Sequence, residues 1–141
     1  MNERSVRWFF VAVGVFYLLN FIGLLPGLSE PLLTVMYPEA GLPVGGEGSS
    51  LLQDAWAVIG AQLGAIGVVA LWGAREPRRY AAVIPVVIAV EVFDAFWDIY
   101  SIVFSGEALW FGLTTLFLHI VWIVWAYAAW VGLSARSPQV Q

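Results

Sequence analysis

Four long apolar stretches separated by short polar connections make up most of the chain. They cover about residues 6–25, 51–72, 80–104 and 108–133, and each reaches the roughly 20 mostly apolar residues that a helix needs to cross a bilayer. A β-barrel would require many segments of alternating polarity, whereas these stretches are apolar throughout. The pattern predicts a single all-α membrane domain over residues 1–141, an integral membrane bundle of four transmembrane helices.

The connection over residues 26–50 is much longer than the one over residues 73–79. Within it, Ser29-Glu30-Pro31 is typical of a helix start, with Ser29 as the N-cap and Pro in the first helical turn, where it is favoured. Apolar residues follow up to Met36, and Pro38 ends the run. We therefore predict a short helix that either lies on the lipid headgroups or covers one mouth of the bundle.

Composition narrows the class of protein further. Hydrophobic residues make up 61% of the chain and charged residues 11%, and the mean hydropathy is +0.85. Such values exclude a disordered segment, a nucleic-acid-binding module and an ordinary cytosolic enzyme, so the expected partner is the lipid bilayer. The chain has no Cys, which excludes disulfides and iron–sulfur clusters, and no Lys, which excludes a retinal Schiff base.

The distribution of charge predicts the orientation in the membrane. The basic residues lie before the first stretch, between the second and third, and after the fourth: Arg4, Arg7, Arg75, Arg78, Arg79 and Arg136. The other two connections carry only acidic charges: Glu30, Glu39, Glu47 and Glu107. By the positive-inside rule, both termini and the 73–79 connection are cytoplasmic, and the protein belongs in the inner (cell) membrane.

Polar side chains inside the apolar stretches are the candidates for function, because such groups are costly in a bilayer. They are Asn20, Asp54, Gln62, Glu91, Asp94, Asp98 and His119. At about 1.5 Å of rise per residue, they range from about 5 Å below the outer surface, at Asp54, to slightly more than about 17 Å, at Glu91. We therefore expect an outward-open pocket, with Trp97, Tyr100 and Trp122 as its aromatic walls.

Three acids on the third stretch share one helical face, because Glu91, Asp94 and Asp98 are spaced i, i+3, i+7. With no Arg at this depth, they cannot all be ionised in a dry site. Water can reach them, they can be protonated and hydrogen-bonded to each other or to His119, or a cation can lie among them. The same four residues are candidate metal ligands, but with one His and no ligand-pair motif we predict no metal.

Structural explanations stand beside the functional ones. Asn20 and Gln62 are expected to form hydrogen bonds between helices, and Asp54 suits the start of a helix because an acid complements the helix dipole. The G-x-x-x-G motif at Gly60 and Gly64 permits close helix contact within the bundle or between subunits. Pro85 is expected to kink the third helix.

Several short motifs give the chain a family resemblance. They are Phe16-Tyr17-Leu18-Leu19-Asn20, Asp54-Ala55-Trp56, Gly60, Ile66-Gly67, Glu91, Asp98-Ile99-Tyr100 and His119. In these motifs, which are spread over most of its length, the chain resembles the BphX-like family of small bacterial membrane proteins. The resemblance implies a four-helix membrane protein of undefined activity and supplies no catalytic residues.

Three classes of function remain open. The first is a protein that binds or transports a small hydrophobic or cationic molecule in the acidic and aromatic pocket. The second is an accessory subunit of a larger membrane complex or of a homo-oligomer, which the small size and the lack of a soluble domain favour. The third is a membrane enzyme that acts on a lipid-like substrate by acid–base chemistry. No nucleophile triad or phosphate loop supports an enzyme, and the sequence indicates no catalytic residue.

Overall fold

The computed structural model describes residues 2–41 and 46–134. Over these residues the chain is helical and contains no strand. The helices are α1 (Glu3–Gly23), α2 (Ser29–Met36), α3 (Glu47–Gly73), α4 (Val83–Tyr100), a π-helical segment (Ser101–Ser105) and α5 (Leu109–Ser134). The all-α prediction is confirmed, and the four long helices lie within a few residues of the predicted stretches. Arg136, used above to predict the orientation, lies outside the described residues.

Three helices, not four, are long and apolar enough to cross a membrane by themselves: α1, α3 and α5. The remaining long helix, α4, has 18 residues. It carries the three acids Glu91, Asp94 and Asp98. Because three ionisable side chains lie in so short a helix, α4 is not apolar enough to count as a span by composition. The prediction of four spans therefore holds for three helices on length and composition.

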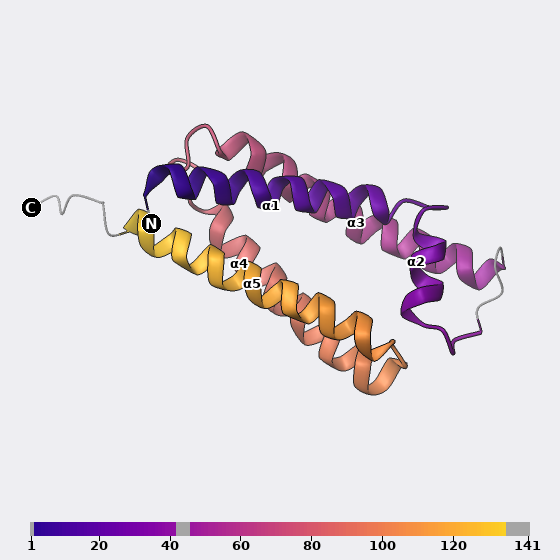
Figure 1. The fold of residues 1–141 in the computed structure, drawn as a ribbon. Coiled ribbons are helices and arrows are strands. Elements are labelled where there is room, and N and C mark those ends of the chain that lie inside the picture. The colour runs from indigo at the N-terminus through magenta and orange to yellow at the C-terminus, as the bar shows by residue number, and fades with distance from the viewer. Residues whose placement is uncertain (1, 42–45, 135–141) are drawn as a thin grey trace, which may run out of the picture.

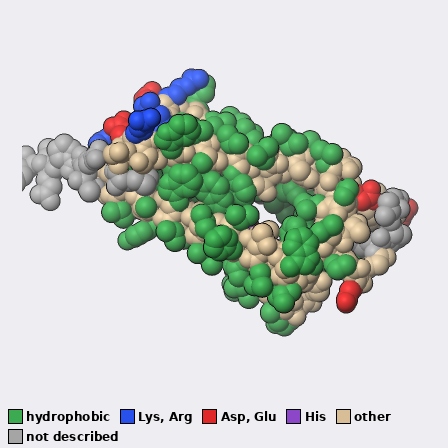
Figure 2. All heavy atoms as spheres, viewed as in Figure 1, with side chains coloured by type: hydrophobic (Ala, Val, Ile, Leu, Met, Phe, Trp, Pro, Cys, Tyr) green, Lys and Arg blue, Asp and Glu red, His purple; other side chains and the backbone are tan. Residues whose placement is uncertain are grey.

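The long helices form two antiparallel pairs (Figure 1). Helix α1 packs along α3, and α4 packs along α5, whereas α3 and α4 make few contacts. The two pairs meet at the end of the molecule where the chain starts and diverge toward the end that carries α2 (Figure 1). Figure 2 shows the surface hollowed between the pairs.

Glycines bring α1 and α3 close together. A Cβ added to Gly67 would lie 2.9 Å from the Gly14 backbone oxygen, and a Cβ added to Gly14 would lie 2.9 Å from the Gly67 oxygen. Gly60 and Gly64 are likewise packed against Leu24 and Phe21. The G-x-x-x-G motif is thus used within the chain, where small residues let two backbones approach.

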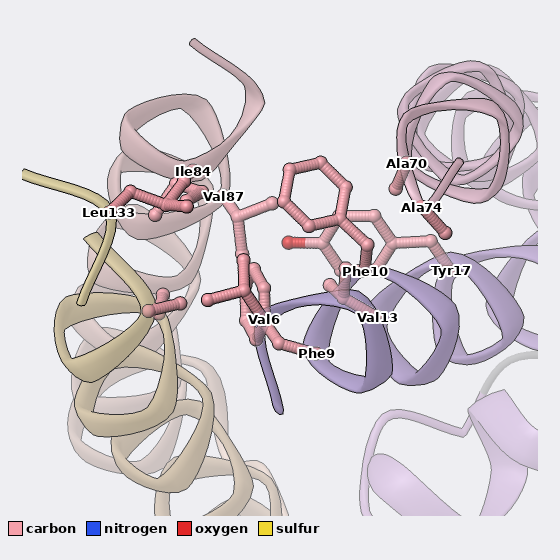
Figure 3. Close-up of a cluster of buried hydrophobic side chains, with 12 residues drawn as sticks. Val6, Phe9, Phe10, Val13, Tyr17, Ala70, Ala74, Ile84, Val87 and Leu133 are labelled. Carbon is pink, nitrogen blue, oxygen red and sulfur yellow. The ribbon is translucent and has the colours of Figure 1, made fainter. Parts of the chain in front are cut away.

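A hydrophobic core joins the two pairs at their meeting point (Figure 3). Its buried members from α1 are Val6, Phe9, Phe10, Val13 and Tyr17, and those from the rest of the chain are Ala70, Ala74, Ile84, Val87, Ala126, Ala129 and Leu133. Most of these side chains are fully buried. The core fixes where α4 and α5 sit against α1, and so it sets the register of the polar residues further along.

Two local predictions need correction. Helix α4 begins at Val83, because residues 74–82 form turns, so Pro85 lies in the first helical turn. Pro is tolerated there since the first N–H groups have no helical partner, and the predicted kink is wrong. The predicted short helix is present as α2, but Ser29 is its first residue, and the preceding Leu28 provides no side-chain cap.

The segment around α2 connects the pairs at the divergent end. The Gly27 N–H, in a turn with φ +84°, donates to Gln53 Oε1 of α3 at 2.9 Å. On the other side, the Ala108 N–H before α5 donates to the Met36 oxygen at 2.7 Å. Tyr37 Oη and Ser101 Oγ also form a hydrogen bond of 2.7 Å. Helix α2 therefore bridges the two pairs, as a cover over one mouth of the bundle would.

Candidate functional site

Glu91 is the centre of the candidate site. Its side chain is fully buried, and both carboxylate oxygens have partners. Tyr17 Oη of α1 donates to Oε1 at 2.6 Å, and His119 Nδ1 of α5 lies 2.6 Å from Oε2. Both partners are side chains from other helices, so this one carboxylate links α1, α4 and α5. Satisfying both oxygens is what allows a carboxylate to be held away from water.

The other ring nitrogen of His119 faces a second acid. Nε2 lies 3.4 Å from Asp98 Oδ2, and Asp98 is 7% exposed. The imidazole therefore lies between the carboxyl groups of two acids. Glu91 and Asp98 are about two helical turns apart and therefore lie on the same side of α4. One imidazole placed against that side contacts both acids. The sequence correctly predicted that these acids share a face, and the structure brings His119 to that face.

Asp94 belongs to a different surface. It is partly buried and lines a groove of about 360 Å³ between α3 and α4. Gln62 also lines this groove, and the remaining lining residues are apolar: Ile59, Leu63, Ile66, Val86, Ala89, Val90 and Phe93. The groove lies beside the Glu91 cluster rather than containing it. Asp94 still interacts electrostatically with His119, Glu91 and Asp98.

The other residues singled out from the sequence lie apart from Glu91. Asn20 donates to the Phe16 oxygen at 2.9 Å, a bond within its own helix, and Asp54 is exposed on α3. Trp97 and Tyr100 stack on each other at 5.3 Å on an exposed face. Trp122 stacks on Trp125 at 5.6 Å and lies 5.0 Å from Phe16.

The weaker metal hypothesis is not supported. Within residues 2–41 and 46–134, no group of three or more His, Asp or Glu side chains has an arrangement that could hold a metal ion. The reason is visible in the geometry, since Asp94 turns into the groove while His119 uses both nitrogens on Glu91 and Asp98.

Two site residues were missed by the sequence reasoning. Tyr17 lies in the middle of an apolar helix. A buried Tyr hydroxyl usually has a hydrogen-bond partner, and this rule could have indicated Tyr17 as a site residue. Glu107 lies in the connection between the third and fourth apolar stretches, yet it is only 6% exposed. Its burial depends on the cover formed by Met36 and Tyr37, which is a tertiary contact.

Around Glu107 lies a second polar cluster, which we call the outer cluster: Tyr37, Asp98, Ser101 and Glu107. Ser101 is fully buried and bonds Tyr37, and its backbone oxygen accepts from the Glu107 N–H at 3.3 Å. Burial raises the pKa of the Glu107 carboxyl, the neighbouring Ser101 side chain partly offsets this, and the charge of Asp98 raises it again. Burial also raises the pKa of the Tyr37 hydroxyl. Asp98 thus takes part in both clusters.

Fold and site together define the class: an all-helical protein with three helices able to cross a membrane and a buried Tyr–Glu–His cluster between them. The chain belongs to the BphX-like family, which it matches over residues 3–135. It is similar to an uncharacterized BphX-like protein of Burkholderia cepacia and to one of Paraburkholderia xenovorans (strain LB400). Each is 59% identical over 134 residues, covering 95% of this chain and 96% of the relative. No solved structure matches the chain.

Proposed function

We propose that the protein is a four-span protein of the inner membrane, with both termini in the cytoplasm, that binds a small lipophilic cation in the groove between α3 and α4. The observation that carries the proposal is a single acid, Asp94, in an otherwise uncharged and mainly apolar groove of about 360 Å³. Small-molecule sites have volumes of about 300–1,000 Å³, apolar walls and a few placed polar groups.

The burial of two of its three acids supports α4 as a fourth span. Glu91 is fully buried and Asp98 is 7% exposed, so neither would meet lipid. With the π-helical segment, the helical run extends over residues 83–105, about 34 Å at 1.5 Å per residue. That length matches the roughly 30 Å of a bilayer core.

The placement of the Arg residues supports the orientation. The described Arg residues precede or begin α1, or lie between α3 and α4: Arg4, Arg7, Arg75, Arg78 and Arg79. Figure 2 shows these basic side chains gathered at one end of the molecule. Cytoplasmic placement of such an end follows from the positive-inside rule. The end that carries α2 and the outer cluster would then face outward.

The groove suits a cation that partitions into lipid. Ile59 and Phe93 on its walls are 49% and 74% exposed, so the groove opens toward the bilayer rather than into the core. Asp94 attracts positive charge, and the ring face of Phe93 adds a weaker attraction of the same sign. Gln62 offers hydrogen bonds from the opposite wall. No basic residue lines the groove to favour an anion.

Binding of tetraphenylphosphonium to the purified protein in lipid nanodiscs tests the proposal. Saturable binding is expected, and Asp94→Asn should weaken it at least tenfold, about 1.4 kcal/mol. Tetraphenylborate, which has nearly the same shape and the opposite charge, should not compete. Asp54→Asn is the matched control, because it removes an exposed acid from α3, one of the two helices that line the groove, without touching the groove. Equal affinities for the two variants, or equal binding of both probes, would reject a cation site at Asp94.

The other two classes of function have no separate observation in their favour. Exposed apolar side chains on α4 and α5 suit lipid as well as they suit the helices of a larger complex. His119 faces carboxylates with both nitrogens, so neither nitrogen is positioned to activate a hydroxyl nucleophile.

A further inference from the structure

Polar side chains form a row from the middle of the molecule to the end that carries α2. The row starts at Tyr17 and Glu91, whose oxygens are 2.6 Å apart. It continues through His119, which is 2.6 Å from Glu91 and 3.4 Å from Asp98. The two contacts of 2.6 Å each join a group that can donate a proton to one that can accept it. The 3.4 Å contact of His119 with Asp98 is an ion-pair distance and forms no hydrogen bond.

The outer cluster extends this row by one further turn of helix. Ser101 follows Asp98 by three residues, and its hydroxyl bonds Tyr37 at 2.7 Å. Glu107 interacts electrostatically with Asp98, and its N–H bonds the Ser101 backbone. The row therefore passes from α4 to the turn before α5, directly beneath the segment that follows α2.

Three buried oxygens along the row lack hydrogen bonds. They are Asp98 Oδ2 and both carboxylate oxygens of Glu107. Asp98 and Glu107 are 7% and 6% exposed, so bulk water does not satisfy these atoms freely. A buried oxygen without a donor costs about 1–3 kcal/mol, which a proton or an ordered water would relieve. Burial also raises the pKa of the Glu107 carboxyl, which favours its protonated form.

In the opposite direction the row ends at Glu91. The next two turns of α4 toward the Arg end present Val87 and Ile84, and α1 presents Val13 and Phe10. Figure 3 shows these apolar side chains filling the space between the helices. Among the described residues, the titratable side chains in this core or packed against it are Tyr17 and Tyr80. The buried positions that α1 and α4 present between Glu91 and the Arg end are therefore apolar.

We propose that Glu107, Asp98 and His119 form a proton relay that opens at the outer end only and delivers protons to Glu91. A proton from outside protonates Glu107 and passes to Asp98 through the Ser101 hydroxyl or a bridging water. Asp98 gives it up to His119 Nε2, and the Nδ1–H bond breaks as an O–H bond forms at Glu91 Oε2. Each transfer forms one bond to hydrogen and breaks one, and the result is a neutral Glu91 and a neutral imidazole.

The groups facing Glu91 suit this step. Tyr17 of α1 holds Oε1, His119 of α5 holds Oε2, and on the same helix Asp94 and Asp98 add negative charge that favours the imidazolium intermediate. The relay goes beyond ligand binding and needs only the four-span arrangement, not an occupied groove.

Time-resolved infrared spectroscopy after a rapid drop in pH tests the relay. The protein is held in nanodiscs, so both faces meet the new pH, and the protonated-carboxyl band that Glu91→Gln removes reports Glu91. Glu107→Gln is expected to slow the appearance of this band at least tenfold, and Asp98→Asn should do the same if the first variant does not fold. Glu76→Gln, which removes an exposed acid at the Arg end, is the control and should leave the rate unchanged.

An unchanged rate in folded Glu107→Gln or Asp98→Asn would overturn the relay, as would slowing by Glu76→Gln or the absence of any band that depends on Glu91. A purely structural role of Glu107 would lower thermal stability without changing this rate. No lipophilic cation is present in the measurement, so its failure is distinguishable from failure of the tetraphenylphosphonium test.

Discussion

A single buried carboxylate, that of Glu91, joins side chains of three helices. Holding an ion away from water costs several kcal/mol unless charge partners and hydrogen bonds compensate. Glu91 has two close partners, one from each pair of helices, at 2.6 Å each. Since Tyr17 belongs to the first pair and His119 to the second, the carboxylate also helps to hold the pairs together.

Removing one hydrogen-bond partner of Glu91 should therefore lower the unfolding free energy more than removing an exposed hydroxyl does. Tyr17→Phe leaves Glu91 Oε1 without a donor, and we expect a loss of about 1–3 kcal/mol in unfolding free energy. Unfolding in mixed detergent, followed by circular dichroism, measures it. Tyr127→Phe is the control, because Tyr127 is 63% exposed and should change stability little. Equal losses for the two variants would show that the Tyr17–Glu91 bond does not stabilise the fold.

Residue spacing predicted part of the candidate site. The i, i+3, i+7 pattern put three acids on one face of α4, and two of them, Glu91 and Asp98, do meet His119. Asp94 points elsewhere because three helical steps of about 100° place it about 60° around the helix from Glu91. That rotation turns it toward the groove beside α3. Tyr17 could not be assigned, since spacing along one helix carries no information on its register against another. Glu107 could not be recognised as buried before the position of α2 was known.

At the scale of helices, backbone contact between α1 and α3 defines the first pair. Gly67→Ala would put a methyl group 2.9 Å from the Gly14 oxygen, a backbone atom that cannot move alone. We expect the variant to lose about 1–3 kcal/mol of stability through overpacking, measured by thermal unfolding in detergent. Gly48→Ala is the matched control in the same helix, where an added Cβ meets nothing within 4 Å.

The control should be neutral or slightly stabilising, because Ala favours a helix over Gly by about 1 kcal/mol. If Gly67→Ala were as stable as Gly48→Ala, the close packing of α1 on α3 would be wrong.

Helix positions were largely predictable, whereas their ends were not. Apolar runs of about 20 residues leave little choice but a helix, and α1, α3 and α5 follow them closely. The start of α4 shifted to Val83 because residues 74–82 satisfy their backbone groups in turns. Nothing in the sequence signals the π-helical segment Ser101–Ser105, whose irregularity coincides with the outer cluster.

At the scale of the whole molecule, the surface is apolar along the helices and charged at the two ends. Large hydrophobic residues such as Trp72, Phe96 and Phe117 are 56–70% exposed. In water such a surface would drive association, whereas in a bilayer it is the expected lipid-facing surface. Trp8 and Trp110 are also exposed, each near the start of its helix. Since α1 and α5 begin at opposite ends of the molecule (Figure 1), these aromatic residues suit the two membrane interfaces.

Everything functional depends on α4 crossing the membrane, since both the groove and the relay lie along it. The chain contains no Cys, so single cysteines report sidedness without background. Ser50→Cys before the apolar part of α3, Glu76→Cys in the Arg-rich connection and Ser105→Cys after α4 are all at exposed positions. A membrane-impermeant maleimide is added to intact spheroplasts, and again after permeabilisation.

The most direct result is the comparison of positions 76 and 105, which flank α4. If α4 is a span, Ser105→Cys and Ser50→Cys react in intact spheroplasts, and Glu76→Cys reacts only after permeabilisation. If positions 76 and 105 react from the same side, α4 does not cross, and neither an outward relay nor a groove between two spans can be correct.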